Sequence, residues 1–179
     1  CTGAYWNPPY IRCTGVHGNV NLYSAMAQSC NTYFQEMGRR AGKDEIVRIA
    51  REFGLGSKTG IDLPGETAGV LPSPEWKFAK NDEPMQKQHE AKLNQLDEKY
   101  ESLIAQAGSE QEKKELLRKK EKEKAALEAQ YRIDYNWSTR WQDYDTYNMS
   151  IGQGYNNFSV IQLAAYVSAI ANGGSLWRP

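Results

Sequence analysis

The stretch "YNMSIGQGYNNFSVIQLAAYVSAIANGG", residues 147–174, decides the fold. Its second half predicts a helix, because Ser159 is a suitable N-cap with Gln162 three residues on, and Asn172-Gly173 is a stop signal. The residues between these signals, 160–170, are mostly apolar. A helix that is apolar on nearly every side is expected in the middle of a core rather than on a surface. We therefore expect a globular domain organised around this helix.

The N-terminal part of the chain predicts further helices of the same domain. Asn19 or Asn21 is a suitable N-cap for a first helix through Met26. A second helix follows the "SCN" triplet, and residues 43–53 form a third, ended by glycine. Glycine, tryptophan, tyrosine and proline are frequent in residues 1–82 and 136–179. These two segments are predicted to be the first and second parts of one globular domain.

The middle segment, residues 83–135, has a different composition. Twenty-three of its 53 residues are charged, and it is rich in Lys, Glu, Gln, Ala and Leu, which are strong helix formers. Its apolar positions follow a 3-4-3-4 spacing, typical of a narrow seam along one helix face; they are Leu93, Leu96, Tyr100, Leu103 and Ala107. A weaker stripe follows at Leu116, Leu117, Leu127 and Tyr131.

A turn separates these two helices. Gly108 is expected to end the first helix in a left-handed cap, and Ser109 to cap the second, with Glu112 completing a capping box. Two helices joined by a tight turn fold back on each other. The segment is therefore predicted to be an antiparallel helical hairpin inserted into the domain.

Charge and hydropathy exclude several classes of partner. The 22 basic and 22 acidic residues cancel, so nothing indicates a nucleic-acid or anionic-membrane surface. The apolar runs are too short to span a membrane. The chain begins with "CTGAYW" and stops at "SLWRP" inside apparent structure, so both ends are expected to be cuts in a larger protein.

The cysteines leave two alternatives open. Cys1 and Cys13 flank the turn-forming "NPPY" cluster, so they could pair in a disulfide; the favoured alternative is two buried thiols acting as small hydrophobes. No group of His, Cys and carboxylate residues has the sequence spacing of a zinc site. No metal and no organic cofactor are predicted.

Four blocks in order carry a resemblance to a known family. They are "VHGNVNLYSAMAQSCNTYF", "FGLGSKTGIDLPGETAGVLP", "YNMSIGQGYNN" and the apolar helix after it. Together they resemble the transpeptidase domain of class B penicillin-binding proteins, most closely the elongation type. The resemblance implies an α+β fold class: part of the penicillin-binding and β-lactamase-like transpeptidase fold, mostly its helical portion, with the helical hairpin inserted.

The resemblance assigns roles to two residues of the "SCN" triplet. Members of the family use a Ser-x-x-Lys nucleophile, a Ser-x-Asn loop and a Lys-Thr/Ser-Gly strand. Ser29 and Asn31 match the second element and are the predicted catalytic residues. The Ser29 hydroxyl would relay a proton, and the Asn31 amide would bind the substrate. The structural alternative is that Ser29 caps the helix from Thr32 onward and that Asn31 bonds to the local backbone.

The other two catalytic elements are missing from the sequence. No serine is followed by lysine three residues later. Lys58-Thr59-Gly60 has the right letters, but it follows a helix exit, leads into the Pro64-Gly65 turn and precedes "SIGQG" instead of following it. We predict a loop there, with Lys58 facing solvent. His17 and His89 are predicted to have no catalytic role.

The resemblance implies a function for the parent protein. It would be a serine-type D-Ala-D-Ala transpeptidase that cross-links peptidoglycan stem peptides and binds β-lactams, with its nucleophile upstream of Cys1. It would be anchored in the bacterial cell membrane, act on its extracytoplasmic face and contact cell-wall elongation proteins. This piece alone is expected to be inactive. Two alternatives remain: a β-lactam-hydrolysing or β-lactam-sensing enzyme, and a cell-wall scaffold acting through the hairpin.

Overall fold

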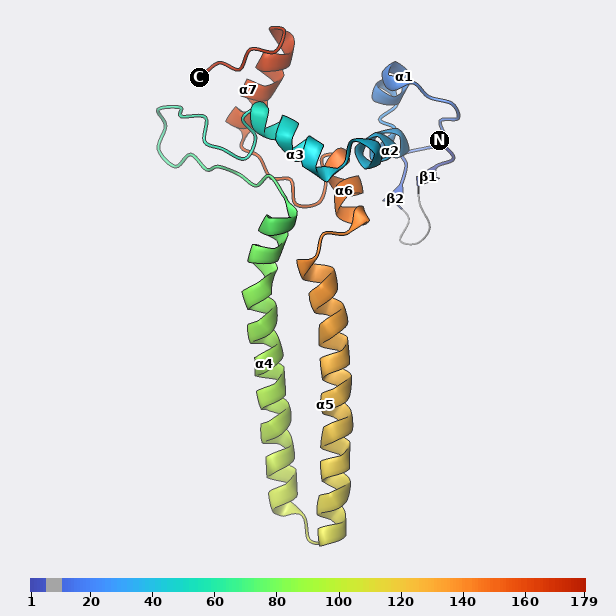
Figure 1. Ribbon diagram of the computed structural model, residues 1–179, viewed down its shortest axis with the longest axis vertical. Helices are drawn as coiled ribbons and strands as arrows, with labels where there is room; N and C mark the ends of the chain where they lie inside the picture. The colour runs from blue at the N-terminus through green and yellow to red at the C-terminus, as the bar shows by residue number, and fades with distance from the viewer. Residues whose placement is uncertain (6–10) are drawn as a thin grey trace. The chain divides into compact units, whose positions relative to one another are not determined.

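The computed structural model describes residues 1–5 and 11–179, which form two compact units. The first unit joins Cys1–Ser73 to Gln142–Pro179, and the second is Pro74–Trp141. Figure 1 traces the chain through both units. Among the described residues, no helix is both long and apolar enough to cross a membrane.

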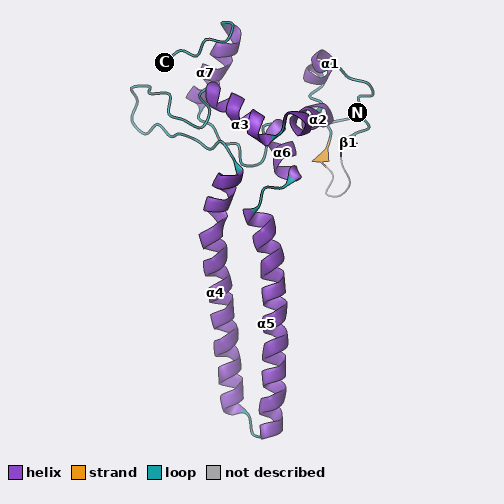
Figure 2. Cartoon of the chain, in the orientation of Figure 1, coloured by secondary structure: helices purple, strands orange, loops and turns teal. Residues whose placement is uncertain are grey.

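The first unit is mainly helical, with one small sheet (Figure 2). Its strands, β1 (Ala4–Tyr5) and β2 (Ile11–Arg12), pair antiparallel, with Ala4 opposite Arg12. Its helices are α1 (Leu22–Ala27), α2 (Asn31–Ala41), α3 (Lys43–Glu52), α6 (Asp143–Ser150) and α7 (Val160–Ala171). The predicted fold class, a mostly helical piece of a mixed α+β fold with an inserted helical hairpin, is confirmed.

Helix α2 packs closely on α6. A Cβ atom added at Gly38 would overlap the Cβ of Ser150, so the two backbones can approach only because residue 38 is glycine. Tyr147 and Met149 of α6 are buried beside this crossing. The crossing therefore connects a helix from the first part of the chain to one from beyond the hairpin.

Helix α7 begins and ends as predicted, but its apolar surface is not covered. The Ser159 side chain accepts a hydrogen bond from the Gln162 amide, and the Gln162 side chain accepts from Ser159, which completes the capping box. The side chains of Val160 and Val167 are nonetheless 84% and 58% exposed. The expectation of a helix buried on all sides is wrong within this chain, because the described residues supply a cover for only one face.

The side chain of Gln162 ties α7 to the loop that precedes the hairpin. It is 1% exposed, and its Nε2 donates to the carbonyl oxygens of Ala68, at 2.8 Å, and Ser57, at 2.5 Å. Val70 and Asn157 also exchange backbone hydrogen bonds in an isolated antiparallel bridge. One buried amide thus satisfies two backbone groups from a segment about a hundred residues away.

The second unit is an antiparallel pair of long helices, α4 (Pro74–Gln106) and α5 (Glu110–Thr139), which lie side by side in Figure 1. Both extend beyond the charge-rich segment, and α4 runs through Pro84. Ser109 caps α5 by accepting from the Glu112 amide, as predicted. The Glu112 carboxylate instead accepts from the amide of Gly108, whose backbone is not left-handed, so that part of the predicted turn is wrong.

The seam between the two helices repeats every eleven residues rather than every seven. Apart from Asp97, the positions that are not exposed run 3-4-4 from 82 to 107, along α4 and just past its end, and α5 has the same pattern from 113 to 138. The predicted 3-4-3-4 spacing is therefore wrong near the turn, where Leu103 is exposed and Ile104 takes its place. A repeat of about 3.67 residues per turn is close to that of a straight helix, so the pair needs no left-handed supercoil.

Polar pairs crosslink this seam. The hydroxyl of Tyr100, which is 2% exposed, donates to Glu123 at 2.8 Å, and Lys99 bonds the other oxygen of the same carboxylate at 2.9 Å. Lys120 pairs with Asp97 at 2.7 Å. Burial first, and then the Glu123 carboxylate, raise the pKa of Tyr100. These specific partners set the register of two helices that have few large apolar side chains to do so.

Replacing Gln162 with leucine is expected to destabilise the first unit by about 1–3 kcal/mol, because the two hydrogen bonds from its buried amide are lost. The free energy of unfolding, measured by denaturant titration of the protein carrying this chain, checks the prediction. Gln153→Leu is the matched control, since Gln153 is exposed and its change should stay within about 0.5 kcal/mol of zero. Equal effects of the two variants would contradict the role assigned to the buried amide.

Candidate functional site

Ser29 lies at a left-handed turn between α1 and α2. Its φ is 50°, and it is the non-glycine residue with a positive φ among those described. The amide of Ser29 donates to Met26 O at 3.2 Å, and that of Cys30 donates to Ala25 O at 2.8 Å. This pair of bonds is a Schellman motif, whose left-handed position is usually glycine. A serine therefore occupies a position that is unfavourable for its backbone, as residues at functional sites often do.

Asn31 begins α2, directly after this turn. The N-cap of α2 is Cys30, and the described residues give it no side-chain capping bond. The alternative in which Ser29 caps this helix is therefore not what the structure shows. The Asn31 side chain donates from Nδ2 to Arg12 O at 3.3 Å, and it is half-buried whereas Ser29 is exposed.

The side chain of Thr14 also contacts this turn. Its hydroxyl donates to the carbonyl oxygens of Ser29, at 3.2 Å, and Gln28, at 3.4 Å. These are carbonyl groups at the end of α1, which the helix itself cannot satisfy. Thr14 had no role in the sequence interpretation, since a lone threonine in a loop carries no recognisable pattern.

A cluster of three thiols and one imidazole lies beside the turn. The ligand atoms of Cys1, Cys13, His17 and Cys30 all lie within 4.8 Å of one another. The three cysteines are free thiols, with Cys30 buried and the other two half-buried, so the disulfide between Cys1 and Cys13 is not formed. The sequence interpretation missed this group because its members come from three separate segments. The short Cys13-x-x-x-His17 spacing was the available signal.

Two of the distances in the cluster match those around a tetrahedral zinc ion. Zinc–sulfur and zinc–nitrogen bonds of about 2.3 and 2.1 Å place two sulfur ligands about 3.8 Å apart, and sulfur and nitrogen about 3.6 Å apart. The observed distances are 3.8 Å between the sulfurs of Cys13 and Cys30, and 3.6 Å from Cys13 Sγ to His17 Nδ1. Four protein ligands would close the coordination sphere, so such an ion would stabilise the fold rather than activate water.

The thiol of Cys13 is suited to this role. Desolvation raises its pKa, but hydrogen bonds from the backbone of Thr32 and Gly15, and from the Cys30 and Thr32 side chains, outweigh this and lower it to about 6. A thiol with this pKa is largely deprotonated at neutral pH, and the thiolate is the form that binds metals.

Lys58-Thr59-Gly60 is a loop, as predicted, and Lys58 is exposed. The carboxylate of Glu66 accepts from the amide and hydroxyl of Thr59, at 2.6 and 2.7 Å, and from the amide of Gly60 at 3.2 Å. These bonds, that of the Thr59 hydroxyl above all, lower the pKa of Glu66. The triplet thus serves to close a surface loop and contributes no catalytic strand.

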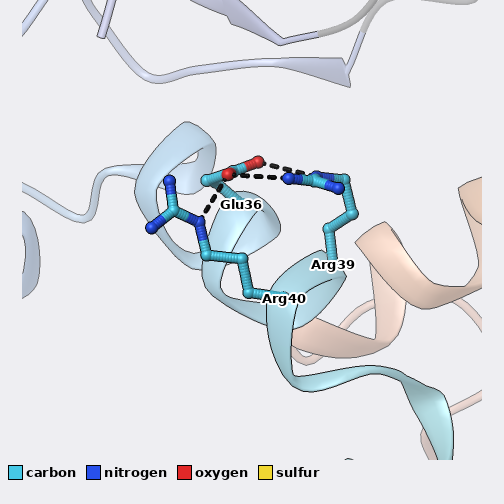
Figure 3. Close-up of polar contacts among 3 residues, drawn as sticks. All are labelled: Glu36, Arg39 and Arg40. Atoms are coloured by element: carbon cyan, nitrogen blue, oxygen red, sulfur yellow. Dashed lines mark hydrogen bonds and ion pairs between the residues drawn. The ribbon is translucent and has the colours of Figure 1, made fainter.

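The charged residues of α2 do not add to the site. Glu36 accepts two hydrogen bonds from Arg39 and one, at 2.6 Å, from Arg40 (Figure 3). These three charged side chains are thus paired with one another within α2. His89 is in the other unit, stacked on Tyr131 with ring centroids 3.9 Å apart. The predicted site residues that the structure brings together are therefore Ser29 and Asn31.

The chain matches one family model over nearly its whole length. The model is described as the penicillin binding protein transpeptidase domain, and it matches residues 4–179. Peptidoglycan D,D-transpeptidase MrdA from Acinetobacter baumannii is 48% identical over 62 residues, which are 35% of this chain and 9% of that protein. Stage V sporulation protein D from Bacillus subtilis is 43% identical over 63 residues, 34% of this chain and 10% of that protein. The chain thus spans about a tenth of the length of these curated relatives.

Solved structures share the fold. The chain is similar to the penicillin-binding protein PBP2 of Helicobacter pylori in its complex with MreC, with a TM-score of 0.64 and 23% identity, covering 99% of this chain and 23% of that one. It is also similar to PBP2 of Pseudomonas aeruginosa in complex with WCK 5153, with a TM-score of 0.62 and 24% identity, covering 99% and 29%. At these identities the likeness concerns the fold alone.

The thiol cluster predicts that the protein binds zinc. After equilibration with zinc and dialysis, elemental analysis is expected to find one ion per chain, and Cys30→Ser or His17→Asn should lose it. Chelation should also lower the melting temperature, because metal binding contributes to folding. His89→Asn is the matched control and should retain the metal. Wild-type protein that stays free of zinc in this experiment would contradict the assignment.

Proposed function

The chain belongs to the penicillin-binding protein transpeptidase family, as an elongation-type class B member, and on that premise we propose that it is part of a peptidoglycan D,D-transpeptidase. The match over residues 4–179 and the transpeptidase names of its relatives support the proposal. The observation that carries it is the left-handed Ser29, an exposed hydroxyl held at an unfavourable backbone position within the family's Ser-x-Asn motif.

The proposed reaction is acyl transfer through a serine ester. A nucleophilic serine attacks the carbonyl carbon between the two terminal D-alanines of a stem peptide, and D-alanine leaves as the amine. An amine of a neighbouring strand then attacks the ester and restores the serine. No Ser-x-x-Lys sequence occurs in this chain, so the proposal assigns the nucleophile and its lysine to another part of the parent protein. A β-lactam would acylate the same serine.

Ser29 and Asn31 are proposed to have different roles: Ser29 transfers a proton, and Asn31 binds the substrate. The exposed Ser29 hydroxyl can both accept and donate a proton, as needed between the lysine and the departing or attacking amine. Asn31 uses one N–H for Arg12 O. Its second N–H and its carbonyl oxygen remain for hydrogen bonds to a peptide group of the substrate.

The partner and the cellular location of the parent protein are proposed on the same premise. The Helicobacter pylori relative is in complex with MreC, which supports an elongation protein as a partner of this one. The parent is proposed to be membrane-anchored, with this domain on the extracytoplasmic face of the bacterial cell membrane. The relatives named transpeptidase favour this function over the β-lactam-hydrolysing or β-lactam-sensing alternative.

The helical pair is proposed to be an insertion, residues 83–135, between transpeptidase segments 1–82 and 136–179. The helices themselves reach Pro74 and Thr139. Several of their surface charges pair within the same helix, for example Lys87 with Glu83 and Lys119 with Glu115. Others pair between the two helices, as Lys99 does with Glu123. Such self-contained pairing favours a tolerated surface insertion over a scaffold that binds other cell-wall proteins.

Ser29→Ala in the full-length parent is expected to retain β-lactam acylation, seen by mass spectrometry at a serine of a Ser-x-x-Lys sequence. Its cross-linking turnover should fall about 10²–10⁴-fold, the usual contribution of proton transfer by a positioned group. Ser57→Ala, at an exposed loop serine, is the control and should keep both activities. Folded wild-type protein that is never acylated would overturn the transpeptidase proposal. Wild-type turnover in Ser29→Ala would overturn only the proton relay.

Replacing residues 84–134 with a short glycine-serine turn is expected to leave cell growth and shape intact in a complementation assay. The reason is that both helices bury their seam against each other, so a shortened pair exposes no new core. Loss of complementation by a deletion variant that is still acylated by β-lactam would instead support the scaffold role.

A further inference from the structure

Two tripeptides of the first unit pair residue by residue, in opposite directions. Thr14 Oγ1 contacts Ser29 O at 3.2 Å, Cys13 Sγ contacts Cys30 Sγ at 3.8 Å, and Arg12 O accepts from Asn31 Nδ2 at 3.3 Å. Every residue of the Ser-x-Asn motif thus has its own partner in Arg12-Cys13-Thr14. Each of these contacts involves at least one side chain, so the pairing of the two tripeptides is not a backbone extension of the β1–β2 sheet.

We propose that Arg12-Cys13-Thr14 is a template that positions the Ser-x-Asn motif, and that Thr14 is the positioning residue for the Ser29 hydroxyl. This inference rests on the proposed function, because it assigns Thr14 a role in the reaction that Ser29 serves. Thr14 does not touch the reacting atoms. It acts through the backbone of Gln28 and Ser29.

The left-handed turn explains why the motif needs such a template. The two Schellman bonds join the amides of Ser29 and Cys30 to the carbonyl groups of Met26 and Ala25, so the carbonyl groups of Gln28 and Ser29 take no part in them. The single hydroxyl proton of Thr14 is shared between these two oxygens. The left-handed conformation is less stable for serine than for glycine. The two hydrogen bonds from Thr14 act as a clamp on the turn and oppose a change of the Ser29 backbone to another conformation.

The position of the Ser29 hydroxyl depends on this backbone angle. Rotation about φ moves Cβ, and with it Oγ, around the backbone. A proton relay works only when its oxygen is within hydrogen-bond reach of both the donor and the acceptor. Loss of the clamp should therefore slow the chemical step while leaving substrate binding through other groups largely unchanged.

Thr14 is itself exposed, so its role in positioning Ser29 can be distinguished from a role in the stability of the fold. Replacing its hydroxyl with a methyl group leaves the two carbonyl oxygens open to water, so no buried polar group loses its partner. A merely structural threonine would change the melting temperature or the fraction of active molecules. A positioning threonine changes the turnover of each active molecule.

The test compares Thr14→Val with Thr14→Ser in the full-length protein. Turnover of a D-Ala-D-Ala peptide is divided by the number of active sites titrated with a fluorescent penicillin. In Thr14→Val, kcat per titrated site is expected to fall about three- to tenfold, the equilibrium factor of one neutral hydrogen bond, with KM within about twofold of wild type. Thr14→Ser keeps the hydroxyl and should restore kcat.

Two controls sharpen the comparison. Thr67→Val makes the same chemical change at an exposed threonine of the same unit and should leave kcat unchanged. In a Ser29→Ala background, Thr14→Val should have no further effect, because the group that it positions is gone. Additive effects in this double variant would overturn the proposal, as would equal kcat values for wild type and Thr14→Val.

A second measurement tests the template independently of activity. Hydrogen exchange of residues 25–32 reports on the amides of Ser29 and Cys30, which close the Schellman motif. Their protection is expected to fall in Thr14→Val and to return in Thr14→Ser. Unchanged protection in Thr14→Val would overturn the positioning role. Absence of transpeptidation in wild type, with the exchange result as expected, would overturn the proposed function and leave the template in place.

Discussion

The left-handed turn at Ser29 is the constraint on which the candidate site depends. It ends α1 and allows α2 to begin two residues later. The turn therefore determines where the side chains of Cys30 and Asn31 point. The Cys30 thiol is directed inward among Cys13 and Thr32, and the Asn31 amide reaches Arg12. A right-handed backbone at residue 29 would displace both. The conformation that is costly for a serine is thus the one that gives the whole motif its arrangement.

The thiol cluster and the Ser-x-Asn motif share a residue. Cys30 is the middle member of Ser29-Cys30-Asn31 and also one of the four groups that could hold a metal ion. Any change in the cluster, whether metal binding or oxidation of thiols, therefore acts on a side chain flanked by both candidate catalytic residues. The first residues of the chain take part as well, since Cys1 belongs to the same cluster.

Local patterns in the sequence predicted local features of the structure well. The caps at Asn21, Ser109 and Ser159, the loop at residues 58–60 and the antiparallel hairpin were all accessible, because each depends on a few neighbouring residues. The thiol cluster and the Thr14 contact were not, since they join segments that only the folded chain brings together. The uncovered face of α7 escaped prediction for a related reason: periodicity shows how apolar a helix is, whereas its cover comes from elsewhere in the fold.

The eleven-residue repeat of α4 and α5 has a consequence for how this part of the protein can vary. Eleven residues make slightly more than three turns, so removing or adding eleven residues in each helix returns every remaining seam position to nearly the same face. The length of the pair would then change in steps of about 16 Å, while the partners on either side of the change stay in register. Relatives with longer or shorter versions of this helical pair should therefore differ by multiples of 22 residues, about three turns for each helix.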